Sequence, residues 1–552
     1  MFANLDDKKL ESILTQGNYI AVEDLSAAVA VTSKTQEPLA DYLIDQRLIT
    51  KDLIGQAIAE SFKIPYSDLN SNVPSPEQLR KIPEDIAKKY RIILFSENKG
   101  KTVIATDQPD TADLSKQLSK LFPKTKITVT YSLSEDIDAC FIAYQKPLDV
   151  RFSEIIESKG RIAPELLEEI FNEALSYRAS DIHFEPRQND VAVRFRIDGS
   201  LHIGGSIPKE YYDNILNRIK VKSALRTDEH FITQDGSFQY RKDSMTADFR
   251  ISIVPTVRGE KVVLRVLSSY VQGLALADVG LSAAHQAFLA SAAKKPFGMI
   301  LVAGPTGSGK TTTLYALLKM VNRPEINITT IEDPVEYKMA GINQIQTNAQ
   351  AGLTFAKGLR SIVRQDPDVV LVGEIRDTET AEIAVNAALT GHLLYSTFHA
   401  NDAATAIPRL LDMGVEPFLL ASTLEVVIAQ RLVRKVCEHC KRSVVRPKSY
   451  FAGPQLRPLA AYFSNKSVTL FEGKKCEMCN YTGYKGRTAI FEFIPLTTEL
   501  QNLIMKNPST QEIATLARKQ GSRTLFEDGI EKVKAGITTL EELLRVAEAP
   551  RS

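Results

Sequence analysis

The chain lacks the features that would place it in a membrane, an oxidising compartment or a strongly charged complex. Its 552 residues include no tryptophan and only 5 cysteines, and the formal net charge is +1. The longest apolar runs are far shorter than the ~20 residues that a membrane-spanning helix needs. The first residues carry acids and lysines where a signal peptide would be apolar. We therefore expect a cytoplasmic protein that binds no nucleic acid and meets its partners through local patches.

Length and composition indicate several globular domains. The apolar fraction is 44% and the charged fraction 24%, as in ordinary globular proteins. A single core stops growing near roughly 250 to 300 residues, so this chain should divide. We predict an N-terminal domain of short helices and an α/β part over residues 1–147, an α+β domain over 148–272, and an α/β domain over 273–552.

Local patterns predict several strands within these domains. Residues 191–197 alternate in polarity and are followed by an Asp198-Gly199 turn, which predicts a hairpin with residues 201–207. Two further strands should be joined at Arg258-Gly259. Residues 298–303 and 368–374 are continuous apolar runs of the kind found in strands covered on both faces. The segment from Pro495 to Ala549 should be helical.

A phosphate loop is the clearest motif. GPTGSGKTTT at 304–313 fits the pattern G-x-x-x-x-G-K-[ST], with a predicted strand before it and a helix after it. Glycines let backbone N–H groups turn toward a phosphate, and the helix adds the positive end of its dipole. Lys310 then reaches the β- and γ-phosphates, and the Thr311 hydroxyl binds Mg²⁺. The predicted ATP-binding residues are Gly304, Pro305, Thr306, Gly307, Ser308, Gly309, Lys310, Thr311 and Thr312.

Two acids and two histidines stand at the ends of predicted strands. Glu332 belongs to the acidic turn IEDPVEY, and Glu374 ends the run DVVLVGE. Such turns are usually only solvated, but ATP hydrolysis needs one carboxylate that prepares the water and one that supports the metal. His392 and His399 flank the run LLYST. They are either structural hydrogen-bonding groups or sensors of the γ-phosphate.

Four of the cysteines form two close pairs. Cys437 and Cys440 belong to CEHC, and Cys476 and Cys479 belong to CEMC, which is the spacing of a tetrahedral Cys₄ zinc site. A redox C-x-x-C is the alternative, which the absence of a βαβ start disfavours. We predict structural Zn²⁺ in a subdomain over about 434–490, with Cys140 as an ordinary buried thiol.

The motifs, taken in order, resemble the secretion ATPase family of type II secretion and type IV pilus machines. The resemblance covers about residues 150 to 549, through GPTGSGKTTT, TTIEDPVEY, GLTFAKGLRSIVRQDPDVVLVGEIRD and TGHLLYSTFHAND. It implies a hexameric motor with a RecA-like α/β domain. By position, Glu332 would be the water-activating acid, Glu374 would assist Mg²⁺ binding with Thr311, and His392 and His399 would form the family's His box.

The segments ASDIHFEP, RFRIDG and PTVRGEKVVLRVL resemble the PAS-like domain that precedes the motor in this family and swings against it. Arginines from such a domain can stabilise charge on the γ-phosphate. The candidates are Arg194, Arg196, Arg250 and Arg265, with solvated strand residues as the alternative. Arg194 and Arg196 should share one face of their strand. Thr233 replaces the proline that the family commonly has in this region.

Two further stretches resemble the assembly branch of the family. NYTGYKGRTAIFE resembles the end of its zinc-bearing insertion, and residues 39–69 resemble its N-terminal domain, which in some members binds cyclic di-GMP. Here Pro38, Leu39 and Ala40 replace the opening Arg-Leu-Gly, and Ser61 replaces a glutamine. We therefore expect docking to inner-membrane and cytoplasmic assembly proteins in place of cyclic di-GMP binding.

The resulting prediction is a homo-hexameric ATPase that drives type IV pilus assembly through a polytopic platform protein, at the cytoplasmic face of the inner membrane. ATP, Mg²⁺ and structural Zn²⁺ are the expected cofactors. The nearest rival function is that of the type II secretion ATPase, which shares every motif used. A nucleic-acid translocase and a regulatory ATP-binding module without motor function are less favoured.

Overall fold

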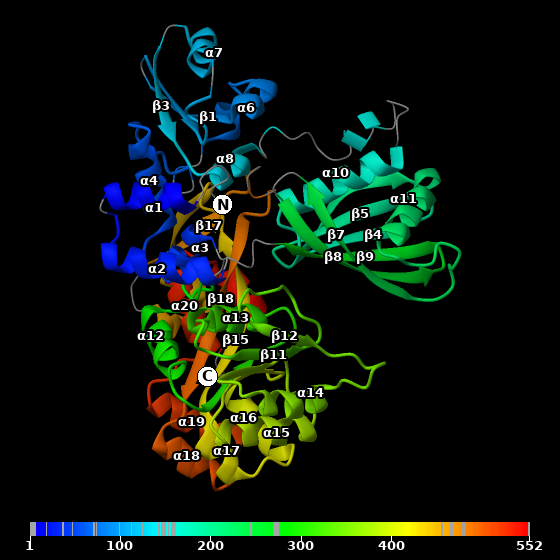
Figure 1. The fold of residues 1–552 in the computed structure, drawn as a ribbon, viewed down its shortest axis with the longest axis vertical. Helices are drawn as coiled ribbons and strands as arrows, with labels where there is room; N and C mark the ends of the chain where they lie inside the picture. Colours follow the sequence, from blue (N-terminus) through cyan, green and yellow to red (C-terminus); the bar gives the residue numbers. More distant parts are fainter. Residues whose placement is uncertain are drawn as a thin grey trace. The chain divides into compact units, whose positions relative to one another are not determined.

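The computed structural model describes residues 7–549 with short gaps, at 18, 36–37, 47, 70–71, 73, 99, 112, 124, 142–143, 145–150, 153, 156–161, 243–244, 269–274, 454–455, 464–466, 477–478 and 480. The chain forms two compact units (Figure 1). One takes residues 1–22 and 49–272, and the other takes residues 23–48 and 273–552. Within the described residues, no helix is both long and apolar enough to cross a membrane.

The N-terminal part is mixed helix and sheet. Its three-stranded sheet has the order β1-β2-β3, with β1 antiparallel and β3 parallel to β2. Apolar side chains from these strands and the neighbouring helices form one core. The elements are α1 (Asp7–Gln16), α2 (Val22–Thr35), α3 (Leu39–Asp45), α4 (Lys51–Ser61), α5 (Pro76–Leu79), α6 (Glu84–Tyr90), β1 (Ile92–Asn98), β2 (Lys101–Thr106), α7 (Leu114–Leu121), β3 (Lys126–Tyr131) and α8 (Ser134–Phe141).

An antiparallel sheet of six strands follows, in the order β6-β5-β4-β9-β8-β7. Helices α10 and α11 pack against one face of it (Figure 1). The hairpin around Asp198-Gly199 and the pair of strands joined at Arg258-Gly259 are both confirmed. The elements are α10 (Ile162–Ser176), β4 (Asp181–Pro186), β5 (Asp190–Ile197), β6 (Ser200–Pro208), α11 (Lys209–Lys222), β7 (Gln234–Lys242), β8 (Met245–Thr256) and β9 (Gly259–Ser268).

The second unit is built on a seven-stranded sheet in the order β12-β11-β13-β14-β10-β15-β18, parallel except for β18. Its strands are β10 (Gly298–Ala303), β11 (Ile328–Glu332), β12 (Asn343–Gln346), β13 (Val369–Val372), β14 (Leu393–Phe398), β15 (Leu424–Val436) and β18 (Tyr484–Pro495). Helix α12 (Ala283–Ala292) precedes β10, and the helices between the strands are α13 (Lys310–Val321), α14 (Phe355–Ile362), α15 (Thr378–Leu389), α16 (Ala403–Asp412) and α17 (Pro417–Thr423).

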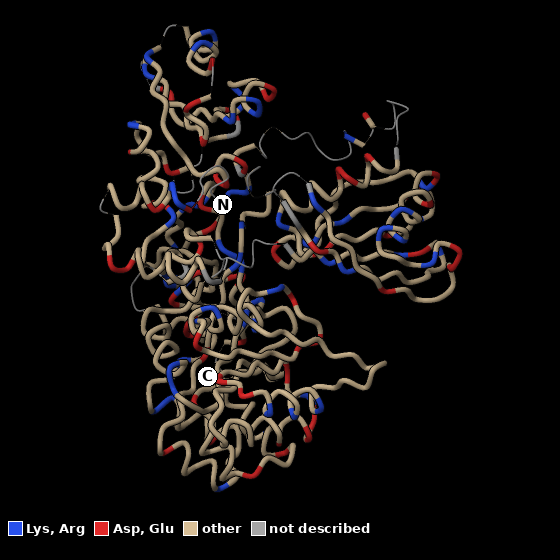
Figure 2. The backbone as a smooth tube through the Cα atoms, viewed as in Figure 1, with Lys and Arg blue, Asp and Glu red and all other residues tan. Residues whose placement is uncertain are grey.

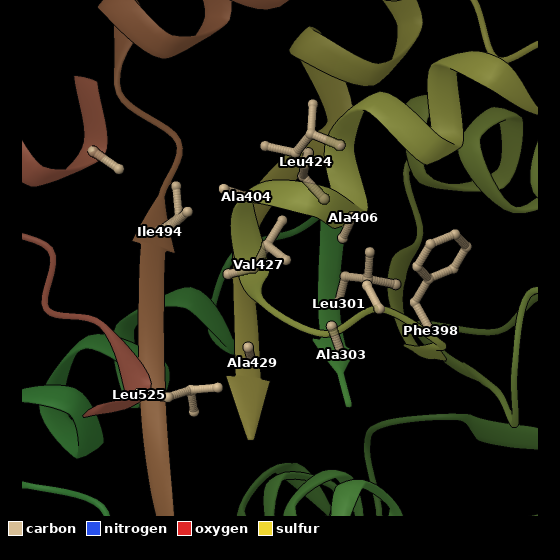
Figure 3. Packing of buried hydrophobic residues seen from close by; sticks show 14 of the residues in the cluster. Leu301, Ala303, Phe398, Ala404, Ala406, Leu424, Val427, Ala429, Ile494 and Leu525 are labelled. Carbon is tan, nitrogen blue, oxygen red and sulfur yellow. The ribbon is translucent and has the colours of Figure 1, made fainter. Parts of the chain in front are cut away.

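Both faces of this sheet are covered, which explains the continuous apolar runs. Leu301 and Ala303 of β10 join Val427 and Ala429 of β15 in one core (Figure 3). The intervening Ile300 and Val302 belong to the core on the opposite face. Successive side chains of a strand alternate between its faces, so a strand buried on both sides needs apolar residues at every position. The predictions for residues 298–303 and 368–374 are confirmed.

The C-terminal part adds a small hairpin and helices. Strands β16 (Lys441–Pro447) and β17 (Ser467–Gly473) pair antiparallel between β15 and β18 in the sequence. The segment after Pro495 is helical, as predicted, with α18 (Thr498–Ile504), α19 (Thr510–Lys519), α20 (Leu525–Lys534) and α21 (Leu540–Val546). Capping boxes at Ser509 and Thr524 satisfy the first N–H groups of α19 and α20. Basic and acidic residues are interspersed along both units, as the net charge suggests (Figure 2).

Candidate nucleotide site and metal centre

The phosphate loop, both predicted acids and one histidine lie at the same edge of the seven-stranded sheet. Strands β11, β13, β14 and β10 are parallel neighbours in that order. Glu332 ends β11, Glu374 follows β13, His399 follows β14, and the loop follows β10. The carboxyl ends of parallel strands meet at one edge of a sheet, which is where open α/β folds bind ligands. The two acids stand at strand ends, as predicted, and the two strands are direct neighbours.

The loop has the shape that a phosphate requires. Gly304, Gly307 and Gly309 have φ angles of +155°, +78° and +86°, which favour glycine. A Cβ on Gly304 would lie 2.6 Å from Ser308 Oγ, so the backbone there tolerates no side chain. The Ser308 hydroxyl is buried without a hydrogen-bond partner in the described part of the chain. A buried polar atom without a partner is costly, and a bound phosphate oxygen would satisfy it.

Lys310 begins helix α13 and folds back onto the loop. Its Nζ donates to the carbonyl oxygens of Gly304 at 2.8 Å and Pro305 at 3.1 Å. Burial lowers the pKa of Lys310, and the charge of Glu374 opposes that effect. The ammonium group is therefore held by weak acceptors beside a carboxylate. An incoming phosphate would be a stronger partner.

Gln430 of β15 lies against the end of the phosphate loop and the first turn of α13. It was not among the predicted site residues. Its Oε1 accepts a hydrogen bond of 2.8 Å from the Thr313 hydroxyl, and its side chain is almost fully buried. A Cβ on Gly309 would lie 2.8 Å from Gln430 Nε2. The available signal was a single glutamine within the otherwise apolar run VVIAQ.

Glu374 contacts a guanidinium group and an imidazole ring. Its Oε1 forms an ion pair with Arg376, and its Oε2 lies 2.9 Å from His399 Nε2. Arg376 also lies 3.9 Å from Asp333. A hydroxyl from Thr311, in the first turn of α13, and the Glu374 carboxylate are hard oxygen donors of the kind that Mg²⁺ prefers. Arg376 was not among the predicted residues, although it stands two positions after Glu374.

Glu332 is surrounded by neutral donors instead. Its side chain is 2% exposed. Tyr315 donates a hydrogen bond to Oε2, Thr330 donates to Oε1 at 2.5 Å, and Gln344 donates to Oε1 at 3.4 Å. Burial raises the pKa of Glu332, while these hydrogen bonds lower it. A raised pKa suits a group that accepts a proton.

The structure does not bring His392 to the phosphate loop of its own chain. His392 precedes β14, whereas His399 follows it, and the six residues of β14 separate them by roughly 20 Å. His392 Nδ1 donates to the carbonyl oxygen of Ala387 at 2.9 Å. This contact fixes the turn between α15 and β14. A catalytic role for His392 stays a prediction.

The four candidate arginines lie in the first unit, on the six-stranded sheet. Phe195 between Arg194 and Arg196 is buried in the core, so the two arginines share the opposite face, as predicted. Arg194 pairs with Glu185 at 3.0 Å, and Arg196 pairs with Asp181 at 3.3 Å.

Three of these arginines form a row across the strands. Arg250 of β8 pairs in register with Arg265 of β9, Arg265 with Asp181 of β4, and Asp181 with Arg196 of β5. Arg265 Nε lies 3.4 Å from Asp181. The Arg265 side chain is 60% exposed. The proposed role of these arginines at a γ-phosphate stays a prediction.

The four paired cysteines converge as predicted. Cys437 follows β15, Cys440 precedes β16, Cys476 follows β17 and Cys479 precedes β18. Neighbouring Sγ atoms lie 3.7, 3.8 and 3.9 Å apart, and none forms a disulfide. Tetrahedral coordination with Zn–S bonds of ~2.3 Å places sulfurs about 3.8 Å apart. The cluster is therefore compatible with zinc. Cys140 is a buried thiol, as expected.

Comparisons with protein families agree with this geometry. Residues 157–545 match the family described as "Type II/IV secretion system protein", and residues 62–150 match the MshEN domain. The first of these matches takes in the phosphate loop, both acids and the cysteine cluster.

Several curated relatives are similar along the chain. The type IV pilus assembly ATPase PilB of Thermus thermophilus is 39% identical over 92% of this chain, which spans 58% of that relative's length. PilB of Acinetobacter baylyi is 35% identical over 97% of this chain and 95% of its own length. The type II secretion system protein E of Pseudomonas aeruginosa is 45% identical over 69% of this chain and 74% of its own length.

Among solved structures, the Legionella pneumophila ATPase DotB aligns with a TM-score of 0.50 at 20% identity, over 69% of this chain and 95% of that one. This supports the fold. The phosphate loop, the paired acids and the match over residues 157–545 lead to one conclusion: the chain belongs to the type II/IV secretion system protein family.

Proposed function

We propose that this protein hydrolyses ATP and uses the energy to drive assembly of a type IV pilus. The observation that carries the proposal is the shared edge of β10, β11, β13 and β14, where the phosphate loop, Glu332, Glu374 and His399 meet. A phosphate-binding loop beside two acids in different surroundings supplies the groups that phosphoryl transfer to water requires.

Different residues of the chain have different roles in ATP hydrolysis. The loop's N–H groups bind the phosphates, and Lys310 transfers its hydrogen bonds from the carbonyl oxygens of Gly304 and Pro305 to the γ-phosphate. Glu332, with its raised pKa, orients the attacking water and accepts its proton. Arg376 and His399 each contact one carboxylate oxygen of Glu374 beside the loop. Arginines of the row on the six-stranded sheet stabilise charge on the γ-phosphate.

Thr311 and Glu374 would hold Mg²⁺, which neutralises charge on the phosphates when bound. Cys437, Cys440, Cys476 and Cys479 would hold structural Zn²⁺. This ion would join the ends of β15, β16, β17 and β18 and so fix the small hairpin to the main sheet. Metal analysis of the purified protein should find one zinc per chain, and Cys476→Ser should lose it.

The choice of a pilus rests on how much of the chain is matched. The Acinetobacter baylyi PilB is similar over 97% of the chain, including the N-terminal region, whereas the Pseudomonas aeruginosa secretion protein covers 69%. Within the part that it matches, the same secretion protein has the higher sequence identity, 45%. A type II secretion ATPase is therefore the second candidate. Either motor would act as a hexamer on a membrane platform protein at the cytoplasmic face of the inner membrane.

Two measurements test this proposal. The purified full-length protein should release phosphate from ATP, and Lys310→Ala should abolish that release. Near-normal turnover of the Lys310→Ala variant would show that ATP is not hydrolysed at this phosphate loop. In the source organism, deletion of the gene should abolish surface pili while leaving type II secretion intact. The opposite pattern would select the second candidate.

A further inference from the structure

Tyr315 connects the phosphate loop to the predicted catalytic acid. It lies in α13, the helix that Lys310 begins, and its side chain is fully buried. Its hydroxyl donates to Glu332 Oε2. The same oxygen lies 3.4 Å from the backbone N of Glu336 and 3.3 Å from Gln344 Nε2, both of which donate to it. One phenol hydroxyl thus joins α13, the end of β11, the turn after it and β12.

The surroundings leave the Tyr315 hydroxyl little freedom. Its ring packs edge-on against Tyr337, with ring centroids 4.7 Å apart. Gln344 is fixed at both ends of its amide, because Oε1 accepts from the Met339 N–H at 2.7 Å and Nε2 donates to the Tyr337 carbonyl oxygen at 3.1 Å. Glu332 is the only carboxylate to which this hydroxyl is seen to donate among the described residues.

We propose that Tyr315 is a positioning residue for ATP hydrolysis, whose hydroxyl holds the Glu332 carboxylate in the orientation that accepts a proton from the attacking water. This inference rests on the role proposed for Glu332. In this proposal Tyr315 acts through its hydrogen bond to Glu332 and not on the nucleotide directly. Because Lys310 belongs to the same helix, binding of the phosphates and orientation of the acid are mechanically linked.

Orientation matters because proton transfer needs the base within hydrogen-bond reach of the water, at about 2.6 to 3.2 Å. A carboxylate released from Tyr315 could rotate about its side-chain torsions, and small misplacements of catalytic groups cost large factors in rate. Binding of ATP depends on the loop and Lys310 instead. The hydroxyl should therefore affect turnover and leave nucleotide affinity unchanged.

The test is Tyr315→Phe in the full-length protein, with Tyr395→Phe as the matched control. Tyr395 is equally buried, belongs to the same core, and its hydroxyl has no hydrogen-bond partner within the described residues. Tyr315→Phe should lower kcat about 10- to 100-fold, as expected for a lost hydrogen bond to a charged group. The Kd for a non-hydrolysable ATP analogue should stay within about 3-fold. Tyr395→Phe should leave both quantities unchanged.

The pH dependence of kcat separates positioning from packing. Burial and the charge of Glu336, the other carboxyl that acts on this group, raise the pKa of Glu332, and the Tyr315 hydrogen bond lowers it. Loss of the hydroxyl should raise the pKa of Glu332 further. The acid must be ionised to accept a proton, so the acidic limb of the kcat profile should move to higher pH in Tyr315→Phe. A packing defect alone would not move it.

Three further outcomes have defined meanings. Equal kcat in Tyr315→Phe and Tyr395→Phe overturns the inference. If Glu332→Gln turns over ATP normally, the proposed role of Glu332 is wrong; if Glu332→Gln is inactive and Tyr315→Phe is normal, only the Tyr315 inference fails. Should Tyr315→Phe not fold, Gln344→Ala decides. Gln344 is a partly exposed donor to the Tyr315 hydroxyl, so its removal should lower kcat about 3-fold or more and leave Kd unchanged. An unchanged kcat overturns the inference.

Discussion

Glu332 and Glu374 end adjacent parallel strands, yet their surroundings are opposite. Glu332 is buried among two hydroxyls and an amide, which donate hydrogen bonds without adding charge. Glu374 contacts Arg376 and His399 and faces Lys310. Burial raises the pKa of Glu332, although its hydrogen-bond donors lower it. The same residue type is thus suited to accepting a proton at one strand end and to supporting a metal at the next.

The largest effect should come from Glu332→Gln, which keeps the shape of the side chain and removes its basicity. Turnover should fall about 10²- to 10⁴-fold, the usual contribution of a general base, while ATP binding persists. Phosphate release and analogue binding measure the two quantities. Glu336→Gln neutralises a nearby carboxyl of the same acidic turn and should lower turnover far less. If Glu374→Gln alone binds ATP without hydrolysing it, the two roles are reversed.

A second buried acid, Glu492, tests what burial does without hydroxyl donors. Glu492 of β18 is 9% exposed, and burial followed by the charge of Asp402 raises its pKa from 4.5 to about 7. A raised folded-state pKa means that stability falls as pH rises from 4.5 to 7. Glu492→Gln removes this loss, so it should stabilise the protein at pH 8 by about 3 kcal/mol.

The measurement is the unfolding midpoint of Glu492→Gln and of the wild type at several pH values. The difference should be near zero below pH 4.5, grow between pH 4.5 and 7, and stay constant above that range. Arg518 and the Ala403 N–H, which also act on Glu492, are unchanged by the substitution. A difference independent of pH would mean that folding does not raise the pKa of Glu492.

Glu374→Gln should lower turnover about 10- to 100-fold by weakening a charged hydrogen-bond network beside the loop. It should also raise the Mg²⁺ concentration that gives half-maximal turnover, because a carboxylate is a better magnesium ligand than an amide. Excess Mg²⁺ should restore part of the activity. No such rescue is expected for Glu332→Gln, so rescue of both variants would contradict the division of roles.

The smallest effect concerns Arg376, whose ion pair with Glu374 would compete with Mg²⁺ for that carboxylate. Arg376→Gln should lower the Mg²⁺ requirement about 2- to 5-fold, the range of an exposed ion pair. Arg360→Gln is the matched control, because Arg360 forms an exposed pair with Glu379. A higher Mg²⁺ requirement in Arg376→Gln would show that Arg376 helps to hold Glu374 in place for the metal.

Much of the site could be predicted because its parts are local in sequence. The phosphate loop depends on glycines at fixed spacing, and the cysteine pairs depend on the geometry of a tetrahedral ion. Glu332 and Glu374 were found because each stands where an apolar strand ends. The partners that distinguish them were not found. Tyr315 and Gln430 look like ordinary buried residues of a helix and a strand, and only strand order brings them to the acid and the loop.

His392 shows the reverse case. In the sequence it directly precedes LLYST and His399 lies two positions after it, so nothing local tells the two histidines apart. The direction of β14 separates them, because one histidine precedes this strand and the other follows it, at opposite ends. By itself, the sequence determined the phosphate loop, the cysteine quartet and the strands, since these depend on short-range spacing and side-chain chemistry. Only the tertiary structure decided which groups surround each acid, because a carboxylate's role depends on its burial and on neighbours distant in the chain.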